Sequence, residues 1–196
     1  MIPILILAAG GSTRMRGTDK LLEPVGGVPL LRVQAKRALA TGQPVFVALP
    51  AADHPRTAAL DGLGVTVLPI PAAAEGMSGT LRDAVAVLPA APAFMLVLAD
   101  LVAITTIDLL TVLAAWRDDS AHLIWRGATT DGKPGHPIIF AGSLRPEFAK
   151  LKGDTGGASI VRANAHKTHL VALPANHARQ DLDTPEDWAK WRGTNG

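Results

Sequence analysis

Short apolar runs alternate with longer amphipathic segments along the first two-thirds of the chain. Four runs are almost wholly apolar and are bounded by Gly, Pro or Asp, namely residues 2–7, 45–49, 65–70 and 94–99. Strands buried on both faces have this pattern. Apolar residues recur at three and four positions, with charges opposite, in residues 29–42, 78–88 and 106–119. That spacing is typical of helices that bury one face, so the order of segments predicts an α/β fold.

The repeated order of strand and helix also predicts how the layers are arranged. Crossovers between parallel strands are nearly always right-handed, so we expect a three-layer α/β/α structure around a mostly parallel, Rossmann-like sheet. Ligands of such sheets bind at the carboxyl ends of the strands. After Ser120 the pattern weakens, and two strand-like runs at 122–127 and 136–142 predict a small β excursion or lid. Pro185 can start a helix in the tail, and the chain contains no repeat or linker, so residues 1–196 are expected to form a single domain.

Composition excludes several classes of function. The 196 residues are 48% hydrophobic and only 4% aromatic, with a net charge of +2 and no cysteine. Disulfides and thiolate metal sites are therefore excluded, and the cytoplasm is the simplest location. Sparse aromatic residues and scattered cations argue against nucleic acid as a partner. No stretch approaches the roughly 20 apolar residues of a membrane-spanning helix, so no membrane association is expected.

Residues 4–27 combine a buried strand, a turn of small residues and several cations. Gly10 and Gly11 would let backbone amides approach a ligand closely, and exposed amides favour an anion. Arg14 and Lys20 could neutralise the charges of a triphosphate. The segment lacks both the P-loop pattern and the glycine pattern of dinucleotide-binding proteins, which argues against a dinucleotide-dependent oxidoreductase. A glycine turn alone needs no ligand, but the cations and the second glycine turn at 25–31 favour a phosphate site.

The same segment resembles a known family. Residues 7–31, "LAAGGSTRMRGTDKLLEPVGGVPLL", are similar to the opening of the molybdenum cofactor nucleotidyltransferases, within the MobA-like NTP transferase and sugar-nucleotide pyrophosphorylase group. Further similar motifs follow in the family's order at 75–81, 97–100, 132–140, 151–157 and 181–188. The resemblance implies a fold like that of the nucleotide-diphospho-sugar transferases. It also implies Mg²⁺-dependent transfer of a nucleoside monophosphate to a phosphorylated acceptor, with pyrophosphate released.

The resemblance assigns the nucleotide site to two loops. Arg14, Lys20 and Asp100 are the expected catalytic residues. The expected nucleotide-binding residues are Leu7, Ala8, Ala9, Gly10, Gly11, Ser12, Arg14, Lys20, Gly76, Met77, Ser78 and Thr80. Ser78 and Thr80 lie where a capped helix would begin, so a purely structural role is the alternative for them. "LAAG" together with "GMSGTL" is more similar to the cytidylyltransferase that uses CTP than to the guanylyltransferase, so CTP is the favoured donor.

Acidic residues supply the expected metal site. Asp100 ends a buried strand, where a carboxylate can hold Mg²⁺ against the phosphates, or can instead cap the next turn. The resemblance makes Asp183 or Asp181 the second metal ligand. Asp183 or Thr184 is the natural cap of the tail helix, so we expect one of the two carboxylates to be structural and the other to face the metal.

The acceptor site is expected to include His136 and Asp154, by resemblance. The chain departs from the family's pattern nearby, since Ala158 and Ser159 stand where an Arg is common. Leu101 and Val102 replace the usual Met-Pro after the metal-binding Asp. A further departure is Arg16, where the family usually has Gly; it either adds a cation for phosphate or faces solvent.

The leading hypothesis is transfer of CMP from CTP to a phosphorylated pterin such as molybdopterin, with a molybdoenzyme or a maturation protein as partner. A sugar phosphate or another small phosphate is the alternative acceptor. The second class of function is a non-catalytic protein that binds nucleotide and delivers a cofactor. The changed loops at 101–105 and 153–159 bear on which acceptor is used.

Overall fold

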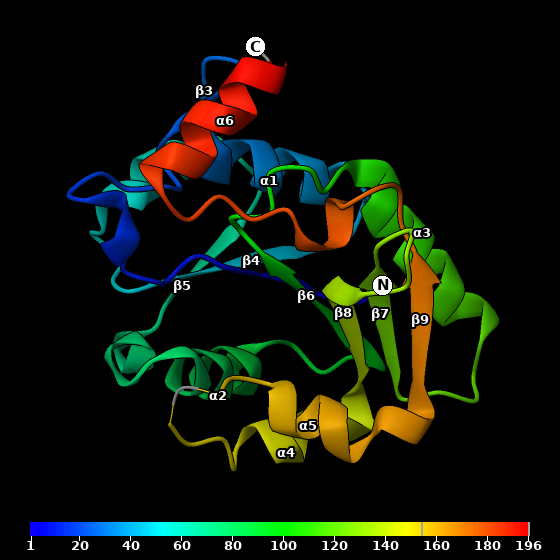
Figure 1. Ribbon diagram of the computed structural model, residues 1–196. Helices are drawn as coiled ribbons and strands as arrows, with labels where there is room; N and C mark the ends of the chain where they lie inside the picture. The colour runs from blue at the N-terminus through cyan, green and yellow to red at the C-terminus, as the bar shows by residue number, and fades with distance from the viewer. Residues whose placement is uncertain (154, 196) are drawn as a thin grey trace.

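A seven-stranded sheet forms the centre of the computed structural model, which describes residues 1–153 and 155–195. The strands lie in the order β5, β4, β1, β6, β8, β7, β9 (Figure 1). Their bounds are β1 Ile4–Leu7, β4 Val45–Leu49, β5 Thr66–Pro69, β6 Ala93–Leu98, β7 Ile124–Ala128, β8 Pro134–Ala141 and β9 Thr168–Ala172. A small separate hairpin pairs β2 (Pro24–Val25) with β3 (Val28–Pro29).

The sheet is mostly parallel. β1 pairs in parallel with β4 and β6, β4 pairs in parallel with β5, and β7 pairs in parallel with β9. β8 pairs antiparallel with both of its neighbours, β6 and β7, so it is the reversed strand of this sheet within the described residues. The order of strands reverses at β1, because β4 lies on one side of it and β6 on the other. In open α/β sheets a ligand binds at such a reversal.

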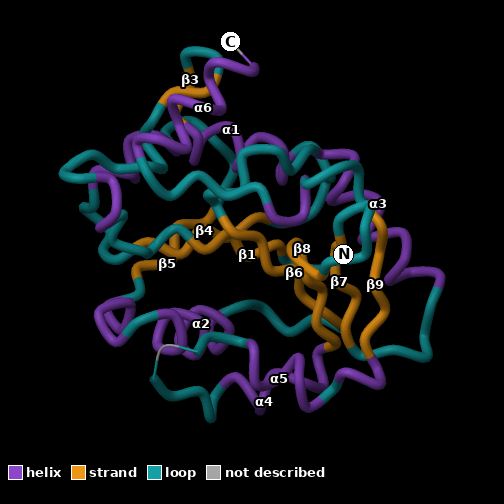
Figure 2. The backbone as a smooth tube through the Cα atoms, viewed as in Figure 1, coloured by secondary structure: helices purple, strands orange, loops and turns teal. Residues whose placement is uncertain are grey.

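Helices cover both faces of the sheet. Figures 1 and 2 show α1, α3 and α6 on one face and α2, α4 and α5 on the other. Their bounds are α1 Leu30–Leu39, α2 Met77–Val87, α3 Thr106–Asp118, α4 Arg145–Phe148, α5 Ala158–Ala163 and α6 Pro185–Asn195. The three-layer α/β/α architecture is therefore the one that the sequence predicts.

Each face of the sheet has its own hydrophobic core, and alternation along β1 explains why. Ile4 and Ile6 pack into the core under α1 and α3, whereas Leu5 and Leu7 pack into the core against α2. Side chains alternate between the faces of a strand, so a continuous apolar run is what both cores require. The second core also holds a cluster of three phenylalanine rings 5.1 to 5.6 Å apart.

Two features differ from the sequence-based expectation. The strands after Ser120 do not form a separate lid; β7 and β8 extend the central sheet, and the unpredicted β9 forms its edge. Of the five residues of β9 only Val171 is buried, and Leu170 and Ala172 are exposed, so this edge strand does not form a continuous apolar run in the sequence. Within the described residues, no helix combines the length and the apolar character needed to cross a membrane.

Candidate active site

A cavity of about 390 Å³ lies at the carboxyl ends of β1 and β6. Its walls come from the turn after β1, the start of α2, the end of β6 and the segment before α6. Most of the residues predicted for nucleotide and metal line it, namely Leu7, Ala8, Ala9, Gly10, Gly11, Arg14, Lys20, Gly76, Met77, Thr80, Asp100, Asp181 and Asp183. The structure thus brings together residues from four distant parts of the chain.

The turn after β1 is open toward this cavity. A Cβ atom added at Gly10 would meet no protein atom within 4 Å. The absence of a side chain there is therefore not required by packing, and it leaves room for a ligand beside the backbone. The backbone turns further along, where Ser12, Arg16 and Gly17 all have positive φ. Arg16 and Gly17 share the turn, and the exposed Arg16 side chain pairs with Glu186 at 2.8 Å.

A buried arginine from outside the turn holds the turn in shape. Arg56 donates from Nε and Nη2 to the two carboxylate oxygens of Asp19, at 2.7 and 2.8 Å. It also donates to the carbonyl of Ala8 and to the hydroxyl of Ser12, at 2.5 and 3.0 Å. Burial disfavours the Asp19 carboxylate, but the hydrogen bond and charge of Arg56 outweigh it and lower the pKa of Asp19. Ser12 thus supports the loop and is not among the residues that line the cavity.

Sequence reasoning missed Arg56 and Asp19. Arg56 lies 37 residues from its partner, in the short 3₁₀ helix Pro55–Leu60, and the sequence there has no motif that indicates its role. Gln34 was missed as well: this buried side chain on α1 donates to the carbonyl of Leu101 at 2.7 Å and so holds the segment after Asp100. Both residues support the cavity without lining it. Their contacts join positions far apart in the chain, and a single sequence does not reveal such contacts.

Lys20 joins the two acidic residues at the base of the cavity. Its Nζ lies 2.6 Å from Oδ2 of Asp100 and 2.6 Å from Oδ1 of Asp183. Burial disfavours the ammonium group, but the two carboxylates outweigh this effect and raise the pKa of Lys20. The lysine is therefore charged at neutral pH and neutralises one of the two carboxylates.

The carboxylate of Asp100 has an oxygen without a partner that a divalent cation could use. Oδ1 of Asp100 is buried and has no hydrogen-bond partner among the described residues. Burial, together with the charges of Asp183 and Asp100, raises the pKa of the Asp181 carboxyl, which faces the same cavity as a third acidic group. Carboxylate oxygens are the ligands that Mg²⁺ and Mn²⁺ prefer. The residues present thus fit a hard divalent cation held by Asp100 and by Asp183 or Asp181.

Thr184 caps α6, so neither of the two acidic residues before it is needed as the cap. The Thr184 hydroxyl accepts a hydrogen bond from the Asp187 amide at 3.1 Å, and the Asp187 carboxylate accepts one from the Thr184 amide at 3.0 Å. This reciprocal pair is a capping box. Neither Asp181 nor Asp183 is therefore the cap, and both line the cavity. Which of the two faces the metal stays a prediction. Asp183 also pairs with the largely exposed Arg14, at 2.7 Å.

The start of α2 forms the opposite wall. Gly76 has φ of 93° and ψ of −165°, a conformation that favours glycine, and a Cβ at Gly79 would lie 2.3 Å from the carbonyl oxygen of Ala72. Thr80 donates back to the carbonyl of Gly76 at 3.2 Å. Ser78 is buried and accepts a hydrogen bond from the Gly156 amide at 3.2 Å, so its hydroxyl is engaged with the protein.

A second cavity of about 300 Å³ adjoins the first and shares Leu7, Met77 and Leu98 with it. Its walls are mainly apolar, and Arg126 and Arg162 are its cations. His136 lines it and has a buried Nδ1 without a hydrogen-bond partner among the described residues.

Burial and the charge of Arg126 lower the pKa of His136 to about 4, so the imidazole is neutral near pH 7. Asp154, the other residue expected to bind the acceptor, lies outside the described residues. Arg162 lies on the same short helix, α5, as Ala158 and Ser159, and it places a cation in the cavity where the family's usual Arg is missing.

Comparison with known proteins finds a family model and several similar structures. The family model of the MobA-like NTP transferase domain matches residues 4–169. The crystal structure of Rv0371c from Mycobacterium tuberculosis H37Rv is 27% identical, with a TM-score of 0.83 over 97% of this chain and 96% of that one. The structure of Rv0371c in complex with manganese is 26% identical, with a TM-score of 0.78 over 96% of each chain.

A more distant structure shares the fold. CMP:2-keto-3-deoxy-manno-octonic acid synthetase complexed with CTP is 18% identical, with a TM-score of 0.77 over 99% of this chain and 98% of that one. No curated protein sequence matches this chain significantly.

Proposed function

Because this chain belongs to the MobA-like NTP transferase family, we propose that it transfers CMP from CTP to a phosphorylated acceptor such as molybdopterin and releases pyrophosphate. The observation that carries the proposal is the position of Lys20 Nζ, 2.6 Å from both Asp100 and Asp183, in the cavity that the turn after β1 opens into. A cation, two carboxylates and exposed amides in one cavity are suited to a triphosphate bound with a divalent ion.

The reaction needs no covalent intermediate on the protein. An oxygen of the acceptor phosphate forms a bond to the α-phosphorus of CTP, while the bond from that phosphorus to the bridging oxygen breaks and pyrophosphate leaves with the electron pair. Arg14, Lys20 and the amides from Ala9 to Gly11, which line the cavity, bind and orient the phosphates. Their positive charge opposes the negative charge that develops on the leaving group, which lowers the barrier.

The proposed cofactor is Mg²⁺, held by Asp100 and by Asp183 or Asp181. The orphaned Oδ1 of Asp100 supports it, as does the manganese bound in the structure of Rv0371c. When bound, Mg²⁺ supplies charge neutralisation at the phosphate oxygens. Lys20 shares the same carboxylates, so it can exchange them for phosphate oxygens when nucleotide enters.

The acceptor is proposed to bind in the second cavity. Its apolar walls suit the face of a ring, and Arg126 and Arg162 supply charge for a phosphate group. The neutral His136 offers a polar contact without adding a charge. These features favour a phosphorylated ring compound such as the pterin over a sugar phosphate, whose many hydroxyl groups would face few polar partners on these walls. The choice of CTP rests on the similarity of "LAAG" and "GMSGTL" to the cytidylyltransferase.

A pyrophosphate-release screen tests the proposal. Each of the four common nucleoside triphosphates is combined with Mg²⁺ and with molybdopterin, a sugar phosphate or no acceptor. We expect release with CTP and molybdopterin. Release only with a sugar phosphate would show that the acceptor is a sugar phosphate and not molybdopterin. Nucleotide binding without any release of pyrophosphate would favour a non-catalytic delivery protein.

A further inference from the structure

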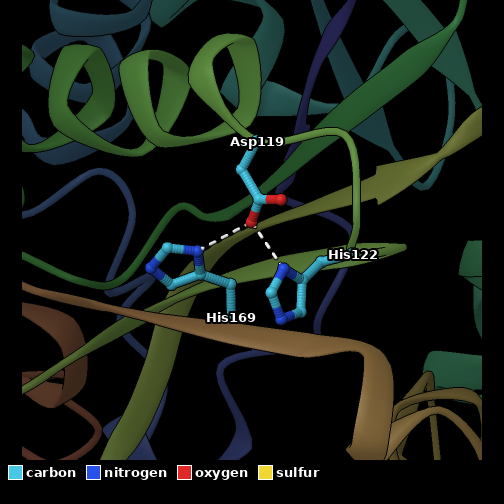
Figure 3. A group of neighbouring side chains, drawn as sticks. All are labelled: Asp119, His122 and His169. Carbon is cyan, nitrogen blue, oxygen red and sulfur yellow. Dashed lines mark hydrogen bonds and ion pairs between the residues drawn. The ribbon is translucent and has the colours of Figure 1, made fainter.

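Three potential metal ligands meet at the edge of the sheet, away from both cavities. Asp119 directly follows α3, His122 precedes β7, and His169 lies on the edge strand β9. Nδ1 of His122 lies 2.5 Å from Oδ2 of Asp119, and Nδ1 of His169 lies 2.9 Å from the same oxygen. Figure 3 shows both rings turning one nitrogen toward this oxygen. None of the three residues lines the nucleotide or the acceptor cavity.

The spacing of the donor atoms suits a single ion. One atom from each residue can be chosen so that all three lie within 4.8 Å of one another. Zinc lies about 2.0–2.2 Å from imidazole nitrogen and carboxylate oxygen, so two ligands of one ion are separated by at most about 4.4 Å. Small rotations of the side chains therefore suffice to place all three atoms around an ion.

The carboxylate is held in position by neighbours that are not ligands. Its Oδ1 accepts a hydrogen bond from the amide of Ala121 at 2.8 Å, and its Oδ2 accepts one from Nε1 of the buried Trp125 at 3.3 Å. Trp125 is also the partner of His169 in the register of β7 and β9. Contacts of this kind orient metal ligands in proteins. Here the pairing of β7 with β9 also fixes the backbone of His169.

Electrostatics also favours a cation at this position. Asp119 stands at the C-terminal end of α3, where the last helix carbonyls add negative partial charge. Its only ion-pair partners among the described residues are the two imidazoles, and no lysine or arginine pairs with it there. A divalent ion would compensate both the carboxylate and the helix end.

We propose that Asp119, His122 and His169 bind a divalent transition-metal ion of the zinc class, separate from the catalytic cation. Imidazole favours Zn²⁺ and similar ions over Mg²⁺. Without an ion, each Nδ1–H donates a hydrogen bond to Asp119. In the metal-bound state each neutral imidazole would carry its proton on Nε2 and offer the lone pair of Nδ1, so the ion would replace these two hydrogen bonds. The imidazole side chains are 34% and 40% exposed, which leaves room for water on the ion. The bound ion links the end of α3 to the edge strand β9.

Zinc binding to the full chain tests this site. The protein is equilibrated with a small excess of Zn²⁺ over chain, in the presence of a large excess of Mg²⁺ to occupy the carboxylate site. Unbound metal is removed, and bound zinc per chain is measured by atomic emission. The variant is His122→Asn/His169→Asn, because the asparagine amide can still donate a hydrogen bond to Asp119 but is a poor zinc ligand. The control is His166→Asn, which changes an exposed histidine three residues before His169.

We expect one equivalent of zinc in the wild type and in His166→Asn, and its loss in the double variant. Zinc should also raise the unfolding midpoint of the wild type and the control but not that of the double variant. Nucleotide transfer should be unchanged in the double variant. Equal zinc in wild type and double variant, no zinc in either, or zinc that is lost instead in Asp100→Asn would overturn the proposal. If the double variant does not fold, His169→Asn gives the same comparison.

Discussion

Lys20 and Asp100 are 80 residues apart in sequence, yet Nζ of the lysine lies 2.6 Å from Oδ2 of the aspartate. The pair joins the turn after β1 to the end of β6, the neighbouring strand in the sheet. The lysine proposed to bind phosphate and the carboxylate proposed to bind the divalent cation therefore contact each other. This arrangement allows the lysine to neutralise the site before substrates and a divalent ion bind.

Removing either partner should abolish most activity without unfolding the protein. Lys20→Ala removes a charge that stabilises the phosphates, and Asp100→Ala removes the proposed metal ligand, so each should lower kcat by about a hundredfold to a thousandfold. Steady-state pyrophosphate release measures the loss, with circular dichroism to check folding. Lys36→Ala, an exposed lysine on α1, is the matched control and should keep wild-type activity. Wild-type rates in Lys20→Ala or Asp100→Ala would refute the assigned site.

Arg56 should act as a positioning residue for the turn after β1. Arg56→Ala leaves the Asp19 carboxylate without its main partner and is expected to cost about 3 kcal/mol in the free energy of unfolding. A double-mutant cycle with Asp19→Ala, followed by urea unfolding near pH 7, should give a coupling of about 2 kcal/mol. Additive effects of the two substitutions would show that the pair does not stabilise the turn.

His136 should make stability depend on pH. Its pKa is about 4 in the folded protein and about 6.5 when unfolded, so the unfolded state binds more protons between these values. The free energy of unfolding should therefore rise with pH from about 4 to 6.5, by at most about 1.4 kcal/mol per pH unit from this residue. Above about pH 6.5 this contribution is complete, and it is lost as the pH falls through about 4.

Comparison with His136→Asn isolates this contribution from that of the carboxylates. The variant should show a shallower rise in stability over the same pH range, whereas His166→Asn, at an exposed position, should follow the wild type. Parallel curves for wild type and His136→Asn would contradict the lowered pKa of this histidine.

Arg162 should affect the acceptor rather than the nucleotide. It lines only the second cavity, so Arg162→Ala is expected to raise the KM for the acceptor by about tenfold, the equivalent of one weakened charged hydrogen bond, and to leave the KM for CTP unchanged. Arg117→Ala, at an exposed position on α3, is the control. A rise in the KM for CTP alone would mean that the second cavity does not receive the acceptor.

The central strands could be predicted from sequence because burial on both faces requires continuous apolar residues. The predicted strand at residues 45–49 coincides with β4, and the tail helix begins at Pro185 as expected. β9 was not predicted, because an edge strand tolerates polar residues and its partner β7 lies far upstream in sequence.

In the site, too, residues within recognisable motifs could be predicted, and residues that act through contacts distant in sequence could not. Lys20, Asp100 and Asp183 follow from motifs, and the structure brings them together in one cavity. Arg56 supports that cavity through contacts with residues far away in sequence, and nothing in the pattern around it signals burial. The capping role of Thr184 was one of two alternatives, and the reciprocal bonds with Asp187 decide between them.

The transfer of label from CTP to the acceptor tests the central claim most directly. CTP carrying radioactive phosphorus at its α-phosphate is incubated with the protein, Mg²⁺ and molybdopterin, and the products are separated by chromatography. We expect the label to move into a pterin–cytidine dinucleotide in step with pyrophosphate release, and to remain in CTP with Lys20→Ala or Asp100→Ala. Label that stays in CTP with the wild type, although the nucleotide is bound, would contradict the proposed transfer.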